Sequence, residues 1–196
     1  MEPVILASSS PRRQEILKML NIPFRVIIPE LKEKIPDDIE TEKIPEFLSV
    51  KKVEAVAKSM PAGSEIPWIV GADTLIILND KIYGKPGTQE EAIQTLKELQ
   101  GKIHKAITGI ALYNGKTHSV SGRSSVNRVT FSRMSEKEIN WYVETGDWHG
   151  AAGGYRIQGL ASCFIKEIRG THSSVVGLPI FELYDMLKEQ GYSLTD

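Results

Sequence analysis

The stretch Val4-Ile-Leu-Ala-Ser-Ser-Ser-Pro-Arg-Arg-Gln-Glu-Ile-Leu17 decides the fold, because it joins an apolar run to a helix through three serines. Ser10 suits an N-cap, and Pro11 suits the first helical position, where its missing N–H costs nothing. Leu17 and Leu20 then fall on one helical face. The stretch therefore predicts a strand, a tight turn and a helix.

The first turn of this predicted helix carries two cations, Arg12 and Arg13. The helix dipole places partial positive charge there, so an exposed arginine would cost roughly 0.3–1 kcal/mol. Free backbone N–H groups, two guanidinium groups and the hydroxyls of Ser8, Ser9 and Ser10 together predict an anion site, most naturally for phosphate. The alternative interpretation is a solvated arginine pair that is tolerated at small cost.

The composition is that of an ordinary globular protein. Hydrophobic residues make up 41% and charged residues 25% of the 196 residues, and this length can bury a substantial core. We expect one domain spanning residues 1–196. The richest apolar run, 68–78, carries Asp73 and is shorter than the roughly 18–20 residues that cross a bilayer, so no membrane segment is expected. No basic region precedes the first apolar run, which is not the pattern of a secretory signal.

Charge and cysteine content narrow the expected partners and compartment. The formal net charge is −1, with 24 basic and 25 acidic residues, and lacks the basic excess of nucleic-acid-binding proteins. Phosphate affinity should therefore be local and directed at a small ligand. The single cysteine, Cys163, excludes an internal disulfide and suits a reducing cytoplasm. It lies in Ser162-Cys-Phe-Ile165, at the start of a strand that we expect at 163–168, and we expect it to be a small buried core residue and not a nucleophile.

Turn and capping signals divide the chain into alternating strands and helices. Thr88 and Ser135 each begin a capping box, and Asn114-Gly115 between two strand-like runs is a strong hairpin signal. Beyond the opening stretch, we expect strands at 24–28, 68–78, 103–113, 117–131 and 163–168, helices at 46–60, 89–100, 136–145 and 180–190, and a surface loop at 29–45. This order predicts an α/β fold with a mixed central sheet that contains a long antiparallel hairpin.

Asp73 is the outstanding acidic residue. A charged carboxylate inside the apolar run 68–78 costs several kcal/mol if it is dry and unpaired. It must therefore pair with a cation or emerge into a cleft, and either case makes it a candidate metal ligand or general base. The alternative is a structural carboxylate paired with a buried arginine.

Other chemical signals are weaker. The chain has no P-loop, no dinucleotide-binding glycine motif, no H-E-x-x-H and no G-x-S-x-G. Its four histidines lack metal-ligand spacing, and the three opening serines suit turn and cap roles better than nucleophilic catalysis. Lys52 in a charged helix and Lys85 in the sequence Gly84-Lys-Pro86 could simply be solvated, although the glycine–proline frame holds Lys85 in a defined direction.

These segments resemble the Maf-type nucleotide pyrophosphatases of the wider Maf/Ham1-like group, over nearly the full length of the chain. The matching segments, in the family's own order, are S-S-S-P-R-R at 8–13, an acidic residue at Glu33, a lysine at Lys52, G-A-D-T at 71–74, G-K-P at 84–86, A-G-x-Y-x-I-Q-G at 152–159 and V-V-G-L-P at 175–179. Two positions depart from the common pattern: Ala151 stands where many members have lysine, and Ser174 where many have asparagine.

The resemblance implies a Maf/Ham1-like (ITPase-like) fold with two lobes around a cleft. It also implies hydrolysis of a nucleoside triphosphate to the monophosphate and pyrophosphate, with Mg²⁺ or Mn²⁺ as cofactor and a homodimer as a possible assembly. The residues to which it assigns roles are Asp73 as proton acceptor, Glu33, Lys52 and Lys85 as further catalytic residues, Glu33 and Asp73 as metal ligands, and Ser8, Ser9, Ser10 and Arg13 as phosphate-binding residues.

Three positions are implied to set the base preference. Arg12, Thr74 and Gln158 match the subtype acting on dTTP and UTP, whereas the subtype acting on 7-methyl-GTP has tryptophan, glutamine and glutamate there. We therefore expect dTTP and UTP as substrates, with modified pyrimidine nucleotides as further candidates. The alternatives are a different base preference and a non-catalytic nucleotide-binding regulator linked to inhibition of septum formation.

Overall fold

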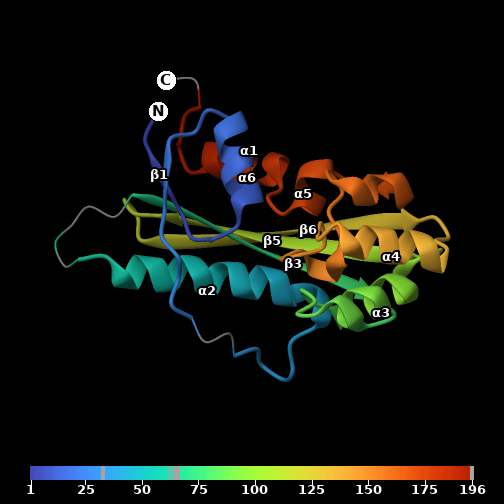
Figure 1. The fold of residues 1–196 in the computed structure, drawn as a ribbon. Helices are drawn as coiled ribbons and strands as arrows, with labels where there is room; N and C mark the ends of the chain where they lie inside the picture. Colours follow the sequence, from blue (N-terminus) through green and yellow to red (C-terminus); the bar gives the residue numbers. More distant parts are fainter. Residues whose placement is uncertain (32–33, 62, 64–66, 195–196) are drawn as a thin grey trace. The chain divides into compact units, whose positions relative to one another are not determined.

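The computed structural model describes residues 1–31, 34–61, 63 and 67–194 (Figure 1). The strands are β1 (Val4–Leu6), β2 (Phe24–Val26), β3 (Trp68–Leu78), β4 (Lys81–Tyr83), β5 (Ile103–Asn114), β6 (Ser119–Phe131) and β7 (Ile165–Arg169). The helices are α1 (Pro11–Met19), α2 (Ile44–Ser59), α3 (Gln89–Leu99), α4 (Glu136–Glu144), α5 (His172–Val176) and α6 (Ile180–Glu189), with 3₁₀ turns η1 (Thr41–Lys43), η2 (Ala152–Gly154) and η3 (Leu160–Phe164).

The strands form one mixed sheet in the order β2-β1-β3-β5-β6-β7, with β4 paired to β3. β1 runs parallel to both of its neighbours, whereas β4 is antiparallel to β3 and β7 is antiparallel to β6. The parallel strand β1 is covered on both faces, and its residues Ile5 and Leu6 are 0% exposed. The predicted α/β fold with a mixed central sheet is confirmed.

The chain forms two compact units. The first consists of Met1–Asp73, Thr108–Ser125 and Gly177–Asp196, and the second of Thr74–Ile107 and Val126–Val176. The strands β3, β5 and β6 each contribute residues to both units. The expectation of a single domain over residues 1–196 stays a prediction.

In the first unit, helices cover both faces of the strands. Figure 1 shows α2 on one face and α1 and α6 on the other. The α2 face buries Val53 and Val56 against Ile5 of β1 and Ile69 of β3. On the other side, Leu17 of α1 is 0% exposed. The apolar residues of the first helix therefore mark the face that it buries, as the sequence predicted.

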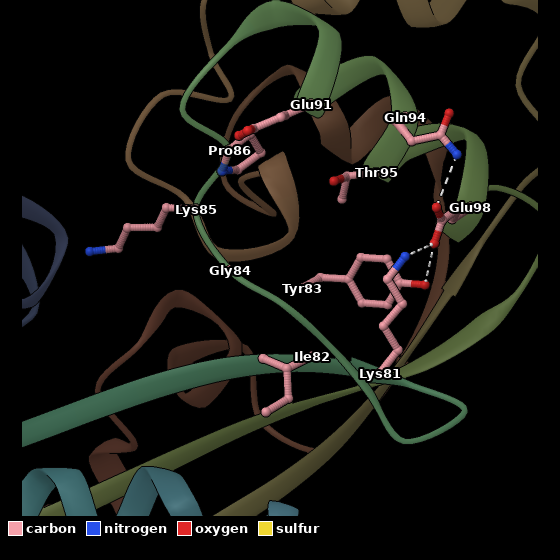
Figure 2. A pocket seen from close by; sticks show the side chains of 10 residues that line it. All are labelled: Lys81, Ile82, Tyr83, Gly84, Lys85, Pro86, Glu91, Gln94, Thr95 and Glu98. Carbon is pink, nitrogen blue, oxygen red and sulfur yellow. Dashed lines mark hydrogen bonds and ion pairs between the residues drawn. The ribbon is translucent and has the colours of Figure 1, made fainter. Parts of the chain in front are cut away.

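The second unit has its own apolar core, in which α3 packs against α4. Leu96 and Leu99 of α3 and Ile139 of α4 are buried there. At the edge of this unit, Lys81 of β4 pairs with Glu98 of α3 at 2.6 Å, a contact drawn in Figure 2.

The capping signals formed as hydrogen bonds, with one difference. At Ser135 the box is complete: its N–H donates to Glu138 Oε2 (2.7 Å) and its Oγ accepts from the Glu138 N–H (3.3 Å). Thr88 Oγ1 likewise accepts from the Glu91 N–H (3.2 Å), but the Glu91 carboxylate accepts from the Gly87 N–H (2.7 Å) instead of returning to Thr88. At this helix the glutamate side chain thus bonds the backbone one residue before the N-cap, and not the N-cap itself.

Two sequence expectations need correction, and a third is confirmed. The strand expected at 163–168 begins only at Ile165, and Cys163 is exposed in the 3₁₀ turn η3 instead of buried in the core. The hairpin expected at Asn114-Gly115 is confirmed: β5 and β6 are neighbours in the sheet and are joined by residues 115–118, where Asn114 Oδ1 accepts from the Lys116 N–H (2.9 Å) and His118 has a positive φ (54°). The last part of the expected loop at 29–45 is helical, because Thr41–Lys43 form η1 and α2 begins at Ile44.

His104 of β5 is a titratable group inside the second unit's core. It is 2% exposed, its Nε2 lies 2.8 Å from Tyr155 Oη, and its ring packs edge-on against Phe131 with centroids 5.0 Å apart. Burial lowers the pKa of His104 from 6.5 to about 4. The folded protein therefore favours the neutral imidazole.

We predict that His104 makes the stability depend on pH between 4 and 6.5. In this range the unfolded chain binds the proton more tightly, so the stabilisation is complete above pH 6.5 and is lost as the pH falls towards 4. A His104→Phe variant should lose less unfolding free energy than the wild type between pH 7 and pH 4, by about 3 kcal/mol at 1.36 kcal/mol per pKa unit. Denaturant unfolding at both pH values measures the difference.

The control is Tyr155→Phe, which removes the hydrogen-bond partner but leaves the buried imidazole to titrate. Its stability should fall with decreasing pH as steeply as that of the wild type. Equal pH slopes for His104→Phe and the wild type would contradict the prediction.

Candidate functional site

The opening turn places serine groups at the start of α1. Ser10 holds the expected N-cap position with extended backbone angles, but its side chain makes no capping hydrogen bond with the described residues. Instead Ser8 Oγ accepts from the Ser10 N–H at 3.2 Å. Ser8 is 6% exposed, whereas Ser9 is exposed at the tip of the turn. Pro11 occupies the first turn as predicted.

Arg13 ties this turn to a distant part of the first unit. Its Nη1 donates to Ser8 Oγ (2.9 Å) and its Nε donates to the carbonyl oxygen of Gly177 (2.7 Å). Desolvation lowers the pKa of Arg13 to about 10; the charge of Asp73 opposes this shift and that of Arg12 adds to it. Arg13 is thus a fixed cation at neutral pH. The alternative interpretation, a solvated arginine pair, is wrong for Arg13.

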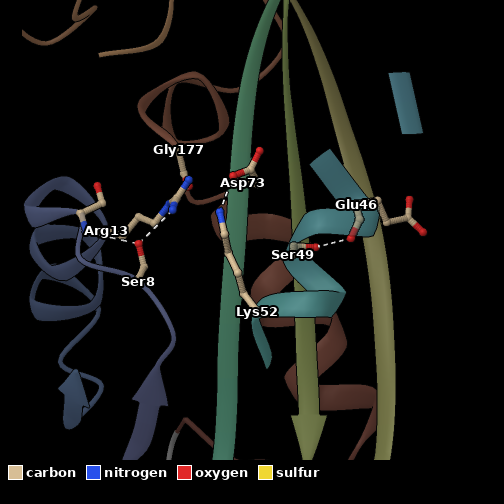
Figure 3. A network of polar contacts seen from close by, with 8 residues as sticks. Ser8, Arg13, Glu46, Ser49, Lys52, Asp73 and Gly177 are labelled. Carbon is tan, nitrogen blue, oxygen red and sulfur yellow. Dashed lines mark hydrogen bonds and ion pairs between the residues drawn. The ribbon is translucent and has the colours of Figure 1, made fainter. Parts of the chain in front are cut away.

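Asp73 pairs with Lys52. The Lys52 Nζ donates to Asp73 Oδ1, and the two side chains are only 14% and 15% exposed. Figure 3 shows Lys52 reaching from α2 to Asp73 on β3, beside Arg13. Residues 73–75 are the partly exposed section of a strand that is otherwise buried. Asp73 therefore both pairs with a cation and emerges from the core, and the cation is a lysine where the alternative interpretation expected a buried arginine.

Glycines on three strands allow α2 to come close to the sheet. A Cβ on Gly109 of β5 would lie 2.2 Å from the Pro45 carbonyl carbon and from the Glu46 nitrogen at the start of α2. A Cβ on Gly122 of β6 would lie 3.3 Å from Glu46 Cγ. Only a residue without a side chain permits the first of these contacts, because both partners are backbone atoms.

The third of these glycines, Gly71 of β3, lies two residues before Asp73, the candidate catalytic residue. A Cβ there would meet Val53 Cγ1 at 2.7 Å and the Ser49 carbonyl oxygen at 2.9 Å. The bare backbone lets this turn of α2 approach β3, and Lys52 lies on the same turn. The Gly-Ala-Asp-Thr sequence thus supplies both the carboxylate at Asp73 and the space for its partner.

A polar contact fixes the start of α2 on β6. Glu46 Oε2 accepts from Ser124 Oγ at 2.8 Å, and the Glu46 carbonyl oxygen accepts from Ser49 Oγ at 2.7 Å. The sequence alone predicted neither this contact nor the close approach of α2 to Gly71, Gly109 and Gly122. The available signal was an isolated glycine inside each predicted strand, which indicates close approach of another backbone.

Three of the remaining candidates belong to the second unit, whereas Arg12 lies next to Arg13 in the first. Thr74 follows Asp73 on β3 and is partly exposed, and Lys85 is exposed in the segment between β4 and α3. Gln158 is exposed directly after buried Ile157. A Cβ on Gly159 would lie 2.3 Å from an Asp147 carboxylate oxygen, so the backbone beside Gln158 is closely packed.

Asp147 anchors the segment that carries Gln158. Its Oδ2 accepts from the Leu160 N–H at 3.0 Å, and its Oδ1 lies 3.5 Å from Arg156 Nη1. The backbone is therefore held on both sides of Gln158, whose side chain faces solvent. Nothing in the sequence had singled out Asp147.

The expected metal site and the expected absence of a membrane segment are compared next with the described residues. Glu33, the expected second metal ligand, lies outside the described residues. Across 1–31, 34–61, 63 and 67–194, no three histidine, cysteine or carboxylate side chains gather as a metal cage. Within those same ranges, no helix has the length and apolar character needed to traverse a bilayer.

We predict that Gly109→Ala destabilises the protein by pushing the start of α2 away from β5. The added methyl group would clash with backbone atoms that cannot rotate away, so the free energy of unfolding should fall by about 3 kcal/mol. The control is Gly84→Ala, because a Cβ at Gly84 meets nothing within 4 Å. Thermal unfolding measures both variants, and an unchanged melting temperature for Gly109→Ala would contradict the described approach of α2.

Comparison with known proteins places this geometry in a family. The family model described as "Maf-like protein" matches residues 3–190. Proteins named dTTP/UTP pyrophosphatase are similar over their full length or nearly so: that of Desulforamulus reducens is 43% identical over 194 residues (99% of this chain, 100% of its own), and that of Alkaliphilus oremlandii is 42% identical over 188 residues (96% of each chain).

A third such protein, from Pelotomaculum thermopropionicum, is 39% identical over 194 residues, covering 99% of this chain and 100% of its own. Among solved structures, the Staphylococcus aureus Ham1 protein is similar at a TM-score of 0.43 and 16% identity, covering 67% of this chain and 72% of that one, a similarity on which no conclusion rests. With a family model that matches residues 3–190 and relatives well above 30% identity, the chain belongs to the Maf-like protein family.

Proposed function

We propose that this protein is a nucleoside triphosphate pyrophosphatase that hydrolyses dTTP and UTP to the monophosphate and pyrophosphate. The observation that carries the proposal is the pairing of Asp73 with Lys52, in the electrostatic field of Arg13. A carboxylate held among cations suits a reaction that must activate water beside a polyanion. The relatives named dTTP/UTP pyrophosphatase support the same activity and substrates.

The phosphates would bind to the opening turn and to fixed cations. A triphosphate carries about four negative charges, and catalysis of phosphoryl transfer rests mainly on positioning and charge stabilisation. Arg13, Lys52 and Lys85 would supply the positive charge, and the turn at Ser8, Ser9 and Ser10 would supply hydroxyl and backbone donors. Ser8 Oγ accepts two hydrogen bonds, from Ser10 and Arg13, so its own proton would be donated to a phosphate oxygen.

Asp73 would accept the proton from the water that attacks the α-phosphorus. As the carboxylate takes up that proton, its attraction for Lys52 falls. The ammonium group would then be available to the negative charge that develops on the departing pyrophosphate. The ion pair would thus link proton transfer to leaving-group stabilisation.

A divalent cation, Mg²⁺ or Mn²⁺, belongs to the proposal. Asp73 is the described carboxylate that would hold it, together with Glu33. This donor set suits Mg²⁺, which usually takes one or two carboxylates along with substrate phosphates and water. When bound, the cation supplies charge neutralisation at the phosphates.

Base recognition would rest on Gln158 and Thr74, with Arg12 shaping the pocket. A side-chain amide offers an acceptor and donors, which match the N3–H and a carbonyl group of uracil or thymine. Cytosine reverses this order, and each buried group left unpaired costs roughly 1–3 kcal/mol. Modified pyrimidines that keep the N3–H and carbonyl pattern would also be accepted.

A second copy of this chain as partner and a cytoplasmic location complete the proposal. The location is supported by the single cysteine, which suits a reducing compartment, and by the nucleotide substrate. The net charge of −1 is consistent with a small-molecule substrate and not with nucleic acid.

We predict a preference for dTTP and UTP over CTP of at least about tenfold in kcat/KM, since 1.4 kcal/mol corresponds to one decade. Release of pyrophosphate and of monophosphate should be measured for a panel of nucleoside triphosphates with Mg²⁺ and with Mn²⁺. Equal rates with CTP would contradict the assigned base recognition. Tight binding without pyrophosphate release would contradict catalysis and support a regulatory nucleotide-binding protein.

We predict that Asp73→Asn lowers kcat by about 10²–10⁴-fold, the usual contribution of general acid–base catalysis, while the protein remains folded. The matched control is Asp185→Asn on α6, which removes a carboxylate that is likewise paired with a cation, Arg123 (2.5 Å). The control should retain normal turnover. Normal turnover in Asp73→Asn would remove this residue from the mechanism.

A further inference from the structure

We propose that Glu98 of α3 is a positioning residue for Lys85, acting through Tyr83 and assisted at the other end of the loop by Glu91. The inference rests on the proposed function, because it concerns how the Lys85 ammonium group is held for catalysis. The loop in question, 84–88, connects Tyr83 at the end of β4 to Gln89 at the start of α3.

Glu98 is the hub at the beginning of this loop. Its Oε2 accepts from Tyr83 Oη at 2.7 Å and from Lys81 Nζ at 2.6 Å, and its Oε1 accepts from Gln94 Nε2 at 2.9 Å. These contacts, with Lys81 first, Gln94 second and Tyr83 third, lower the pKa of Glu98 to about 2. The carboxylate is therefore ionised at any working pH and holds the end of β4 through charge-assisted bonds.

Tyr83 transmits this restraint to the loop. It is the last residue of β4, it is 7% exposed, and the Lys81 ammonium group lies 4.9 Å from its ring centroid. Burial, followed by the hydrogen bond to Glu98, raises the pKa of Tyr83 to about 12, so the phenol remains a donor. Its ring and hydroxyl are thus fixed two residues before Lys85.

The other end of the loop is fixed by the same helix. Glu91 Oε2 accepts from the Gly87 N–H at 2.7 Å, two residues after Lys85. Two carboxylates of α3 therefore restrain the loop on either side of the lysine, one at the end of β4 and one at Gly87.

A third restraint comes from the glycine-rich turn η2. The Gly153 N–H donates to the Gly84 carbonyl oxygen at 2.8 Å, and a Cβ on Gly154 would lie 3.2 Å from Pro86 Cγ. The backbone on both sides of Lys85 is therefore in contact with η2 as well as with α3. The segment after η2 carries Gln158, the proposed base-recognition residue.

Lys85 itself lies apart from this network of carboxylates. Figure 2 shows its side chain extending away from those of Tyr83, Glu91 and Glu98, although all four residues line the same cavity of about 270 Å³. The carboxylates of Glu98 and Glu91 thus act on Tyr83 and Gly87, the residues on either side of Lys85. This separates the charge that restrains the loop from the charge that would contact the phosphates.

The test is a double-mutant cycle on dTTP hydrolysis, with Glu98→Gln, Lys85→Ala and the double variant. Glu98→Gln should lower kcat/KM about tenfold, and Tyr83→Phe, which removes only the hydroxyl, about threefold. In the Lys85→Ala background, Glu98→Gln should change kcat/KM less than twofold, because the group it positions is gone. The control is Glu136→Gln, which breaks the contact of Lys97 on α3 with α4 (3.3 Å) and should not alter kcat/KM.

Amide hydrogen exchange provides the second measurement. In Glu98→Gln, exchange at Gly84 and Lys85 should accelerate at least tenfold, while exchange in α4 of the same unit stays at the wild-type rate. A role in general stability would instead reduce activity equally in both backgrounds and accelerate exchange throughout the unit.

The outcomes separate this inference from the proposed function. If Lys85→Ala is impaired but Glu98→Gln is not, or if the loss from Glu98→Gln persists in the Lys85→Ala background, the positioning role is wrong and the proposed function stands. If Lys85→Ala hydrolyses dTTP as the wild type does, the proposed role of Lys85 is wrong and the positioning role is overturned with it.

Discussion

The ion pair between Lys52 and Asp73 is the interaction on which the candidate site depends. A carboxylate in the middle of a buried strand would be strongly destabilising without a partner, and the partner comes from a helix that must lie unusually close to the sheet. Gly71, Gly109 and Gly122 provide that closeness, one on each of three strands. With Arg13 nearby, the group carries one negative and two positive charges, an excess that favours a polyanionic ligand.

The protein places its two candidate lysines by different physical means. Lys52 is positioned by backbone contact, since glycine allows α2 to rest against the strands. Lys85 is on a loop outside any helix or strand, and hydrogen bonds that Tyr83 and Gly87 donate to Glu98 and Glu91 of α3 restrain the neighbouring residues. Loops commonly carry functional groups, and they need such support to hold a charge in one place.

Local features of this fold could be predicted from the sequence, and long-range contacts could not. The bounds of β3, the cap at Ser135 and the start of α1 at Pro11 follow from apolar patterning and capping chemistry, which act over a few residues. Cys163 was misplaced because an apolar tetrapeptide does not distinguish a strand from a 3₁₀ turn.

For the site, the resemblance to a known family supplied the residues, but not how they contact one another. Lys52 and Asp73 are 21 positions apart, so their pairing depends on the packing of α2 against β3. The same holds for Glu98 and Tyr83, whose contact requires the pairing of β4 and the orientation of α3. Such contacts are set by tertiary structure, which spacing along the chain does not encode.

The bond from Arg13 to Gly177 joins residues 164 positions apart, and Trp68 packs edge-on against Tyr192 with ring centroids 5.6 Å apart. The opening turn is therefore synthesised long before it is completed, since its arginine acquires this partner only when the segment around Gly177 has left the ribosome. A nascent chain would hold the serines and arginines long before it could orient them. The order of translation thus delays the appearance of a working hydrolase until the segment around Gly177 has been made.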